Sequence, residues 1–184
     1  MNNKLILISF SFLTMLMLFL VFKHYLKEIS LNKMIKVAVV AAIYAVLTMG
    51  LAPISYGPVQ FRVSELMVLL AFIDPLYVPG LVLGCVIANF TSPLGIVDIF
   101  FGSFATTISL FMITKSKNLI VASLWPAIFN GIILGLEFNI LTNAPLLATT
   151  LYVAFGEFVV VTIIGCTIMK LMMNNKHIVD QLKL

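Results

Sequence analysis

Charge is scarce in this sequence of 184 residues, and that scarcity decides the class of protein. Only 10% of the residues are charged, whereas 62% are hydrophobic and the mean hydropathy is +1.17. A water-soluble domain cannot cover so much apolar surface. The apolar runs are continuous and about long enough to cross a bilayer, whereas the strands of a membrane barrel alternate apolar with polar residues. The sequence therefore predicts an all-α integral membrane protein.

Residues and motifs that carry enzymatic chemistry are also few. Cys85 and Cys166 stand alone inside apolar runs, so neither a disulfide nor a zinc site is indicated. His24 and His177 lie in polar segments, which leaves the serines of the apolar runs without a histidine base. The chain has neither a Walker motif nor a dinucleotide-binding glycine fingerprint. We therefore expect no enzyme, no metal and no cofactor. The lysines form no basic stripe with interleaved aromatics, so we expect no nucleic-acid partner either.

The apolar runs divide the chain into two parts. Residues 1–32 contain an apolar run over 5–22 and a polar link. They are compatible with an extra helix, with a leader that has no clear cleavage site, or with an over-long start, since Met34 could begin the body. Residues 33–184 are expected to form one six-helix membrane bundle, in which the Asp74-Pro75 pair marks a turn. The six predicted helices cover residues 36–53, 63–73, 76–90, 95–114, 119–141 and 145–173, and the second is short for a span.

The distribution of basic residues predicts an orientation in the cell membrane. If the helices alternate in direction, only Lys4 and Arg62 fall on one side. The other side carries Lys23, Lys27, Lys33, Lys36, Lys115, Lys117, Lys170, Lys176 and Lys183. The positive-inside rule makes that second side the cytoplasm, with the C-terminus in it.

Polar residues inside the apolar runs gather at one depth of the predicted bundle. At about 1.5 Å of rise per residue, most of them fall in the outer third or at the outer boundary, and Asn130 and Glu157 fall nearer the middle. The outer group comprises Arg62, Glu65, Asn89, Asp98, Glu137 and Asn143. Charged residues within a membrane usually mark a polar pathway or binding site. We therefore predict a polar chamber that is open to the outside.

Several of these residues also have a purely structural interpretation. Arg62 and Glu65 are compatible with an ion pair at a helix start, and Asp98 with an acid in a first helical turn. Asn89 and Asn130 are compatible with hydrogen bonds between helices. Glu137 and Glu157 are different, because neither has a cation within one helical turn. An unpaired buried carboxylate needs donors, so these two favour ligand binding.

Small residues repeat at a spacing of three or four along the first helix of the body. Ala38, Ala41, Ala42 and Ala45 form overlapping small-x-x-x-small patterns, which let another backbone come close. The alanines either pack within the bundle or form a docking surface for another membrane protein.

Five stretches together resemble one known family. They are "APISYGPVQFRVSE", "FIDPLYVPGLVLGCVIANF", "GIVDIFFGS", "NGIILGLE" and the "GE" of the last helix. In order and spacing they resemble the QueT family of queuosine-precursor transporters, which are substrate-binding (S) components of energy-coupling factor (ECF) transporters. The resemblance implies a six-helix subunit that captures a 7-deazaguanine, such as preQ0, preQ1 or queuine. Its implied partners are a transmembrane scaffold subunit, docked on the alanines, and two ATPase subunits.

The resemblance also implies how the chamber is used. A carboxylate can accept two hydrogen bonds from a guanine-like edge. The oxygen of the base needs a donor, such as an amide or Arg62. We expect the loop over 52–61, with Tyr56 and Gln60, to act as a lid. The excess of acids favours an amine-bearing precursor, with one of Glu137 and Glu157 on the base edge and the other facing the amine. The alternative is a self-sufficient proton-coupled carrier of a small polar or cationic solute.

Overall fold

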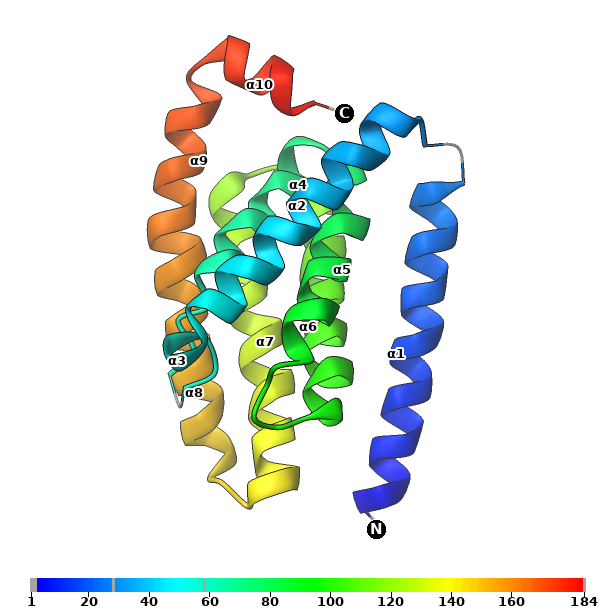
Figure 1. Ribbon diagram of the computed structural model, residues 1–184. Helices are drawn as coiled ribbons and strands as arrows, with labels where there is room; N and C mark the ends of the chain where they lie inside the picture. Colours follow the sequence, from blue (N-terminus) through cyan, green and yellow to red (C-terminus); the bar gives the residue numbers. More distant parts are fainter. Residues whose placement is uncertain (1–2, 28, 58, 184) are drawn as a thin grey trace.

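A computed structural model describes residues 3–27, 29–57 and 59–183, and these residues form helices and loops without a β-strand (Figure 1). Pro58, in the predicted lid, lies outside them. In chain order the elements are α1 (Asn3–Leu26), α2 (Leu31–Gly50), α3 (Ala52–Ser55), η1 (Val63–Leu69), α4 (Leu70–Ile73), η2 (Pro75–Tyr77), α5 (Val78–Asn89), α6 (Ile96–Lys115), α7 (Leu119–Thr142), α8 (Leu146–Glu157), η3 (Phe158–Gly165), α9 (Cys166–Met173) and α10 (Lys176–Leu182).

The lengths of these helices confirm an all-α membrane bundle. Five helical stretches are long and apolar enough to cross a bilayer, and Val63–Ile73 and Pro75–Asn89 are shorter apolar helices. The last long stretch, Leu146–Met173, joins α8, η3 and α9 into one rod. The body therefore has the six predicted segments, preceded by α1. The short helix α10, which follows them, was not predicted.

Local sequence signals explain where the segments begin and end. Asp74 has an extended backbone, and its side chain accepts a hydrogen bond from the Leu76 amide at 2.9 Å, so the predicted turn is confirmed. The Asn118 side chain caps the start of α7. Asn143 ends the same helix in the left-handed conformation with φ 56°. Asn143 is therefore an exposed cap at the end of α7 and not a buried residue of the predicted chamber.

The alanine pattern of α2 is divided between two faces of the helix. Ala41 and Ala45 are buried inside the bundle, whereas Ala38 and Ala42 are exposed. A side chain at Gly84 of α5 would meet the carbonyl oxygen of Ala41 at 2.8 Å, so the glycine allows the two backbones to touch. Two of the four alanines thus pack within the bundle, and the other two remain on its outer surface.

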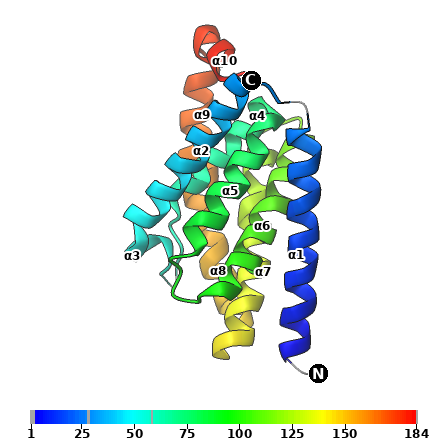
Figure 2. The ribbon, with the colours of Figure 1, turned by 45° about the vertical axis from the view of Figure 1, so that its right-hand side comes forward.

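Helix α1 stands on one side of the bundle, next to α6 and α5 and away from α2 (Figures 1 and 2). The Phe10 ring stacks on Phe101 of α6 with 4.0 Å between centroids, and Thr14 donates to the Phe100 carbonyl at 3.4 Å. Most other side chains of α1 face outward. The N-terminal segment therefore forms a peripheral helix in this structure.

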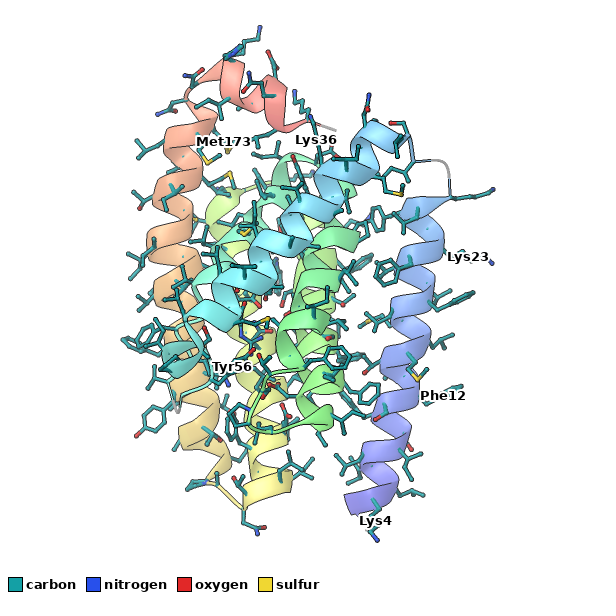
Figure 3. All side chains as sticks on the ribbon, viewed as in Figure 1. Lys4, Phe12, Lys23, Lys36, Tyr56 and Met173 are labelled. Carbon is teal, nitrogen blue, oxygen red and sulfur yellow. The ribbon has the colours of Figure 1, made fainter. Side chains whose placement is uncertain are left out.

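The two ends of the bundle differ in charge. Lys23 and Lys36 lie toward the end that carries α10, whereas Lys4 lies at the opposite end (Figure 3). The ends of α6 and α9 at Lys115 and Lys170 also belong to the α10 end. Below, this end is called the lysine-rich end and the other the lysine-poor end. The predicted separation of the lysines is thus present in the fold.

Candidate functional site

The polar residues predicted for the chamber lie together in the interior, toward the lysine-poor end. The eight that are almost wholly buried, each at most 2% exposed, are Gln60, Arg62, Glu65, Asn89, Asp98, Asn130, Glu137 and Glu157. We call these eight residues the chamber. Tyr56 is partly exposed at its edge (Figure 3). The chamber was predicted to be open, but the structure encloses it.

Glu65, on the 3₁₀ helix η1, is held by residues of two other helices. Its Oε1 accepts hydrogen bonds from the Tyr44 hydroxyl of α2 at 2.5 Å and from the Thr106 hydroxyl of α6 at 3.2 Å. The Arg62 guanidinium lies 4.0 Å from the same oxygen, so the predicted ion pair is present, at long range. Glu65 therefore ties the second segment of the body to α2 and α6 and leaves its Oε2 without a partner in the protein.

Arg62 lies where the loop over 52–61 meets the other chamber residues. Its guanidinium carbon is 5.6 Å from the centroid of the Tyr56 ring, within the range of a cation–π contact. The Tyr56 hydroxyl donates to the Ala88 carbonyl of α5 at 2.6 Å, which fixes the ring over that helix. None of the three guanidinium nitrogens has a hydrogen-bond partner within the protein. Arg62 thus supplies donors to the chamber.

Asp98, Asn89 and Glu137 form one corner of the chamber. The Asn89 side-chain amide donates to the Asp98 backbone carbonyl at 3.1 Å, which joins the end of α5 to the first turn of α6. Glu137 of α7 neighbours the Asp98 side chain. No oxygen of either carboxyl group has a protein partner that satisfies hydrogen-bond geometry, although the two side chains lie close enough to interact with each other, and the Asn89 Oδ1 is also unpartnered. We call these three residues the acidic corner.

Glu157 and Asn130 form a second corner, between α8 and α7. The two side chains are neighbours, and all four of their polar atoms lack a protein partner that satisfies hydrogen-bond geometry. Gly156, just before Glu157, lies against the backbone of Gln60, because an added side chain there would meet the Gln60 carbonyl oxygen. The lid loop therefore packs directly on the helix that carries Glu157. We call Glu157 and Asn130 the mixed corner, because it offers both donors and acceptors.

The two helices of the mixed corner both depart from regular α-helix nearby. Pro126 lies inside α7, one turn before Asn130, and removes a helical hydrogen bond. The π-helix η3 begins directly after Glu157, and its Thr162 hydroxyl donates to the Ser123 carbonyl of α7 at 3.0 Å. Single π-helical turns often occur at functional sites. These irregular turns set Asn130 and Glu157 in adjacent positions.

Unpartnered polar atoms are concentrated in this region. Among the described residues, the buried side-chain atoms without a protein partner belong to the chamber and to Ser55 and Ser103. Buried polar groups in folded proteins are nearly always hydrogen-bonded, because an unmade bond is costly. A cluster that keeps so many donors and acceptors free is suited to a polar ligand.

A pocket of about 360 Å³ lies at the edge of the chamber toward the lysine-poor end. Its lining includes Tyr56 and Gly57 of the lid loop, Phe138 next to Glu137, and Tyr152 of α8. The pocket therefore shares Tyr56 with the wall of the chamber and is a candidate mouth.

Sequence reasoning missed several of the side chains that position the chamber. Tyr44 and Thr106 anchor Glu65, and Ser55 and Ser103 add unpartnered hydroxyls. A signal for Tyr44 existed, because it lies on the same helical face as Ala41 and Thr48, facing the interior. Among the described residues, no group of three or more His, Cys, Asp or Glu side chains could hold a metal ion.

Comparison with known proteins identifies the family. Residues 34–174 match the family described as "QueT transporter". Over 149 residues the chain is 35% identical to a protein of Lactococcus lactis subsp. cremoris (strain MG1363) named "Queuosine precursor transporter QueT", and the match covers 72% of this chain and 88% of that protein. No solved structure matches the chain. The chain therefore belongs to the QueT transporter family, whose members are transporters and not enzymes.

Proposed function

We propose that this chain is the substrate-binding component of an ECF transporter that imports a queuosine precursor, a 7-deazaguanine base. The observation that carries the proposal is the enclosed chamber, in which buried carboxylates, amides and one guanidinium keep their hydrogen-bonding atoms free. The name of the Lactococcus lactis relative supports the choice of substrate.

The groups of the chamber suit a deazaguanine. The base presents a ring N–H and an amino group side by side, which one carboxylate can accept together, and an oxygen that needs a donor. Glu137 and Glu157 offer the carboxylates, and Arg62 and Asn130 offer unpartnered donors. A base enclosed in this way would satisfy groups that are otherwise costly to bury.

The lid loop supports entry from the lysine-poor end. Its contacts with the rest of the bundle include the Tyr56 hydrogen bond to Ala88, the backbone contact between Gln60 and Gly156, and the edge-on packing of Phe61 on Phe155 with 6.4 Å between centroids. We propose that the loop opens for the ligand and closes over it. By the positive-inside rule the lysine-rich end would face the cytoplasm, so the mouth would face outside.

The outer face of α2 is the proposed docking surface for the transmembrane scaffold subunit. Ala38 and Ala42 are exposed there, and the large apolar side chains of Ile35, Val39 and Val46 flank them. Small residues on an exposed helix allow close approach of a second helix within the membrane. Because Ala41 and Ala45 pack inward, they are not part of this surface.

The test of the function separates binding from transport. The purified chain, with no nucleotide-binding motif, is expected to bind a radiolabelled deazaguanine in the absence of ATP. Accumulation of the ligand in vesicles is expected only when the scaffold and ATPase subunits are added with ATP. Accumulation by the chain alone, driven by a proton gradient, would instead establish the proton-coupled carrier.

The test of the docking surface compares two neighbouring alanines. Ala42→Leu places a bulky group on the outer face of α2 and is expected to reduce co-purification with the scaffold while ligand binding is retained. Ala41→Leu, the matched variant, enlarges a residue packed against α5 and is expected to destabilise the bundle itself. Equal co-purification of Ala42→Leu and the unmodified chain would remove this face from the interface.

A further inference from the structure

We infer that the chamber is divided into two subsites, and that the second selects a precursor with a positively charged group. The mixed corner of Glu157 and Asn130 would form hydrogen bonds with the guanine-like edge. The acidic corner of Asn89, Asp98 and Glu137 would bind an ammonium group on the 7-substituent. This inference rests on the proposed function and adds to it which part of the ligand each corner contacts.

The hydrogen-bonding atoms of the acidic corner point to a cation. Its unpartnered atoms are the four carboxyl oxygens of Asp98 and Glu137 and the Oδ1 of Asn89, all of them acceptors when the acids are ionised. The Asn89 amide nitrogen is already used, because its two hydrogens are donated to the Asp98 carbonyl at 3.1 Å and to the Cys85 sulfur at 3.6 Å. An ammonium group has three donors and no acceptor, so it matches this set, whereas a nitrile offers only an acceptor.

The mixed corner matches the other end of the ligand. Glu157 supplies two acceptor oxygens, and the neighbouring Asn130 supplies a free amide nitrogen and a free oxygen. A guanine-like edge carries donors next to an acceptor, which is the complement of a carboxylate beside an amide. The acidic corner has no free donor for the base oxygen. The guanine-like edge is therefore better placed at the mixed corner.

The spacing along α7 fits a single ligand that spans both corners. Asn130 and Glu137 are seven residues apart and lie on the same helical face, which separates their Cα atoms by about 10 Å along the axis. Both side chains are buried in the chamber, at 1% and 0% exposure. A flat bicyclic base with a one-carbon arm is of comparable length, so its edge and its amine can reach the two corners together.

The charges of the chamber support the same assignment. Arg62 is the one basic residue of the chamber, where it lies 4.0 Å from Glu65 and also interacts with Asp98 and Glu137, so one positive charge faces four acids. If Glu157 reads the base edge, Asp98 and Glu137 remain as neighbouring carboxyl groups in a buried site. Two like charges in such a site repel one another, and a cation between them would remove the repulsion.

The experiment measures the dissociation constants of preQ1, which carries an aminomethyl group, and preQ0, which carries a nitrile. Wild-type chain is expected to bind preQ1 more tightly. Glu137→Gln and Asp98→Asn, which keep side-chain shape but remove charge, are expected to weaken preQ1 about 30-fold or more and to lower its preference over preQ0 by a similar factor. Glu157→Gln is expected to weaken both ligands and to retain the preference.

The control is Asp180→Asn, which removes an exposed acid of α10 far from the chamber and is expected to change neither constant. Thermal unfolding of each variant checks that it is folded. If Asp98→Asn fails to fold, Glu137→Gln alone decides the assignment. Equal or tighter binding of preQ0 by the wild type, or an unchanged preference in Glu137→Gln, would overturn the two-subsite inference. If preQ0, preQ1 and queuine all fail to bind the wild type, the proposed function itself is wrong.

Discussion

The two halves of the bundle interior differ in chemistry, although each contains buried apolar residues. Toward the lysine-rich end, Leu69, Leu81, Leu110 and Ile113 are fully buried in one apolar cluster. Toward the lysine-poor end, the chamber buries acids, amides and an arginine with their polar atoms unpartnered. Close packing stabilises the first half, whereas desolvated polar groups cost free energy in the second. The stability of the apolar half therefore offsets the free-energy cost of the unpartnered polar groups in the chamber half.

This division predicts that stability and ligand binding respond to different residues. In the apolar half, a substitution should change stability with little effect on affinity. In the chamber, a substitution should change affinity, and its effect on stability should depend on whether it leaves a charge unpaired.

Arg62→Met is expected to have the largest effect. It removes the one basic residue of the chamber and leaves four buried acids, which should cost about 3–5 kcal/mol of stability as well as ligand binding. Unfolding in detergent, followed at fixed pH, measures the loss. Lys117→Met removes an exposed lysine and serves as the control. Unchanged unfolding of Arg62→Met would show that the chamber acids are not charged in the folded protein.

Leu110→Ala tests the apolar half. Its side chain is completely buried, and the cavity left by the change should cost about 2–5 kcal/mol of stability. The milder Ile113→Val, in the same cluster, should cost about 0.5–1.5 kcal/mol. Affinity for the deazaguanine, measured on the folded fraction, should be the same in both variants and in wild type. A parallel loss of affinity would contradict the division of the interior.

Sequence alone was sufficient for the fold because the membrane imposes a simple pattern. Continuous apolar runs and the turn at Asp74-Pro75 located the six apolar segments of the body, since a backbone in lipid must be helical. The same reasoning located the acids of the chamber, because charges in apolar runs are conspicuous. Helix bounds differed by a few residues, most at the start of α2, where Leu31 precedes the predicted residue 36.

Sequence was insufficient to predict which face of a helix points inward. It was also insufficient to predict that a residue within an apolar run, such as Tyr44, takes part in the site. The four alanines of α2 have one spacing, yet the contact with Gly84 turns Ala41 inward and leaves Ala42 outside. The position of Tyr44 on the face of Ala41 and Thr48 predicts its burial but not its partner. Only the fold shows that its hydroxyl donates to Glu65. Asn143 has the composition of a chamber residue but serves as a cap, because its backbone is left-handed.

Gly156→Ala tests the link between the lid and the chamber. The added methyl group would meet the Gln60 backbone, so the loop must shift, at a cost of about 1–3 kcal/mol. Because the loop borders the chamber, we expect this cost mainly as weaker and slower ligand binding. Gly50→Ala, where an added methyl group meets open space, is the control. Equal affinity in the two variants would show that the lid does not need this contact.

Phe10→Ala tests whether the peripheral helix α1 contributes to either half of the interior, and it should have the smallest effect. Helix α1 contributes none of the chamber residues, and Phe10 meets the bundle through its stacking on Phe101 and its edge contact with Phe104. Because an aromatic side chain outside this contact would lie in lipid and not in water, the contact gains little from the hydrophobic effect. The expected loss of stability is therefore that of the aromatic pairing, about 0.5–1.5 kcal/mol. Phe12→Ala, at a residue 71% exposed on the same helix, should have no effect. Affinity should be unchanged in both variants. Weaker binding by Phe10→Ala alone would mean that α1 supports the first turn of α6, where Asp98 lies, and that the N-terminal helix belongs functionally to the chamber half.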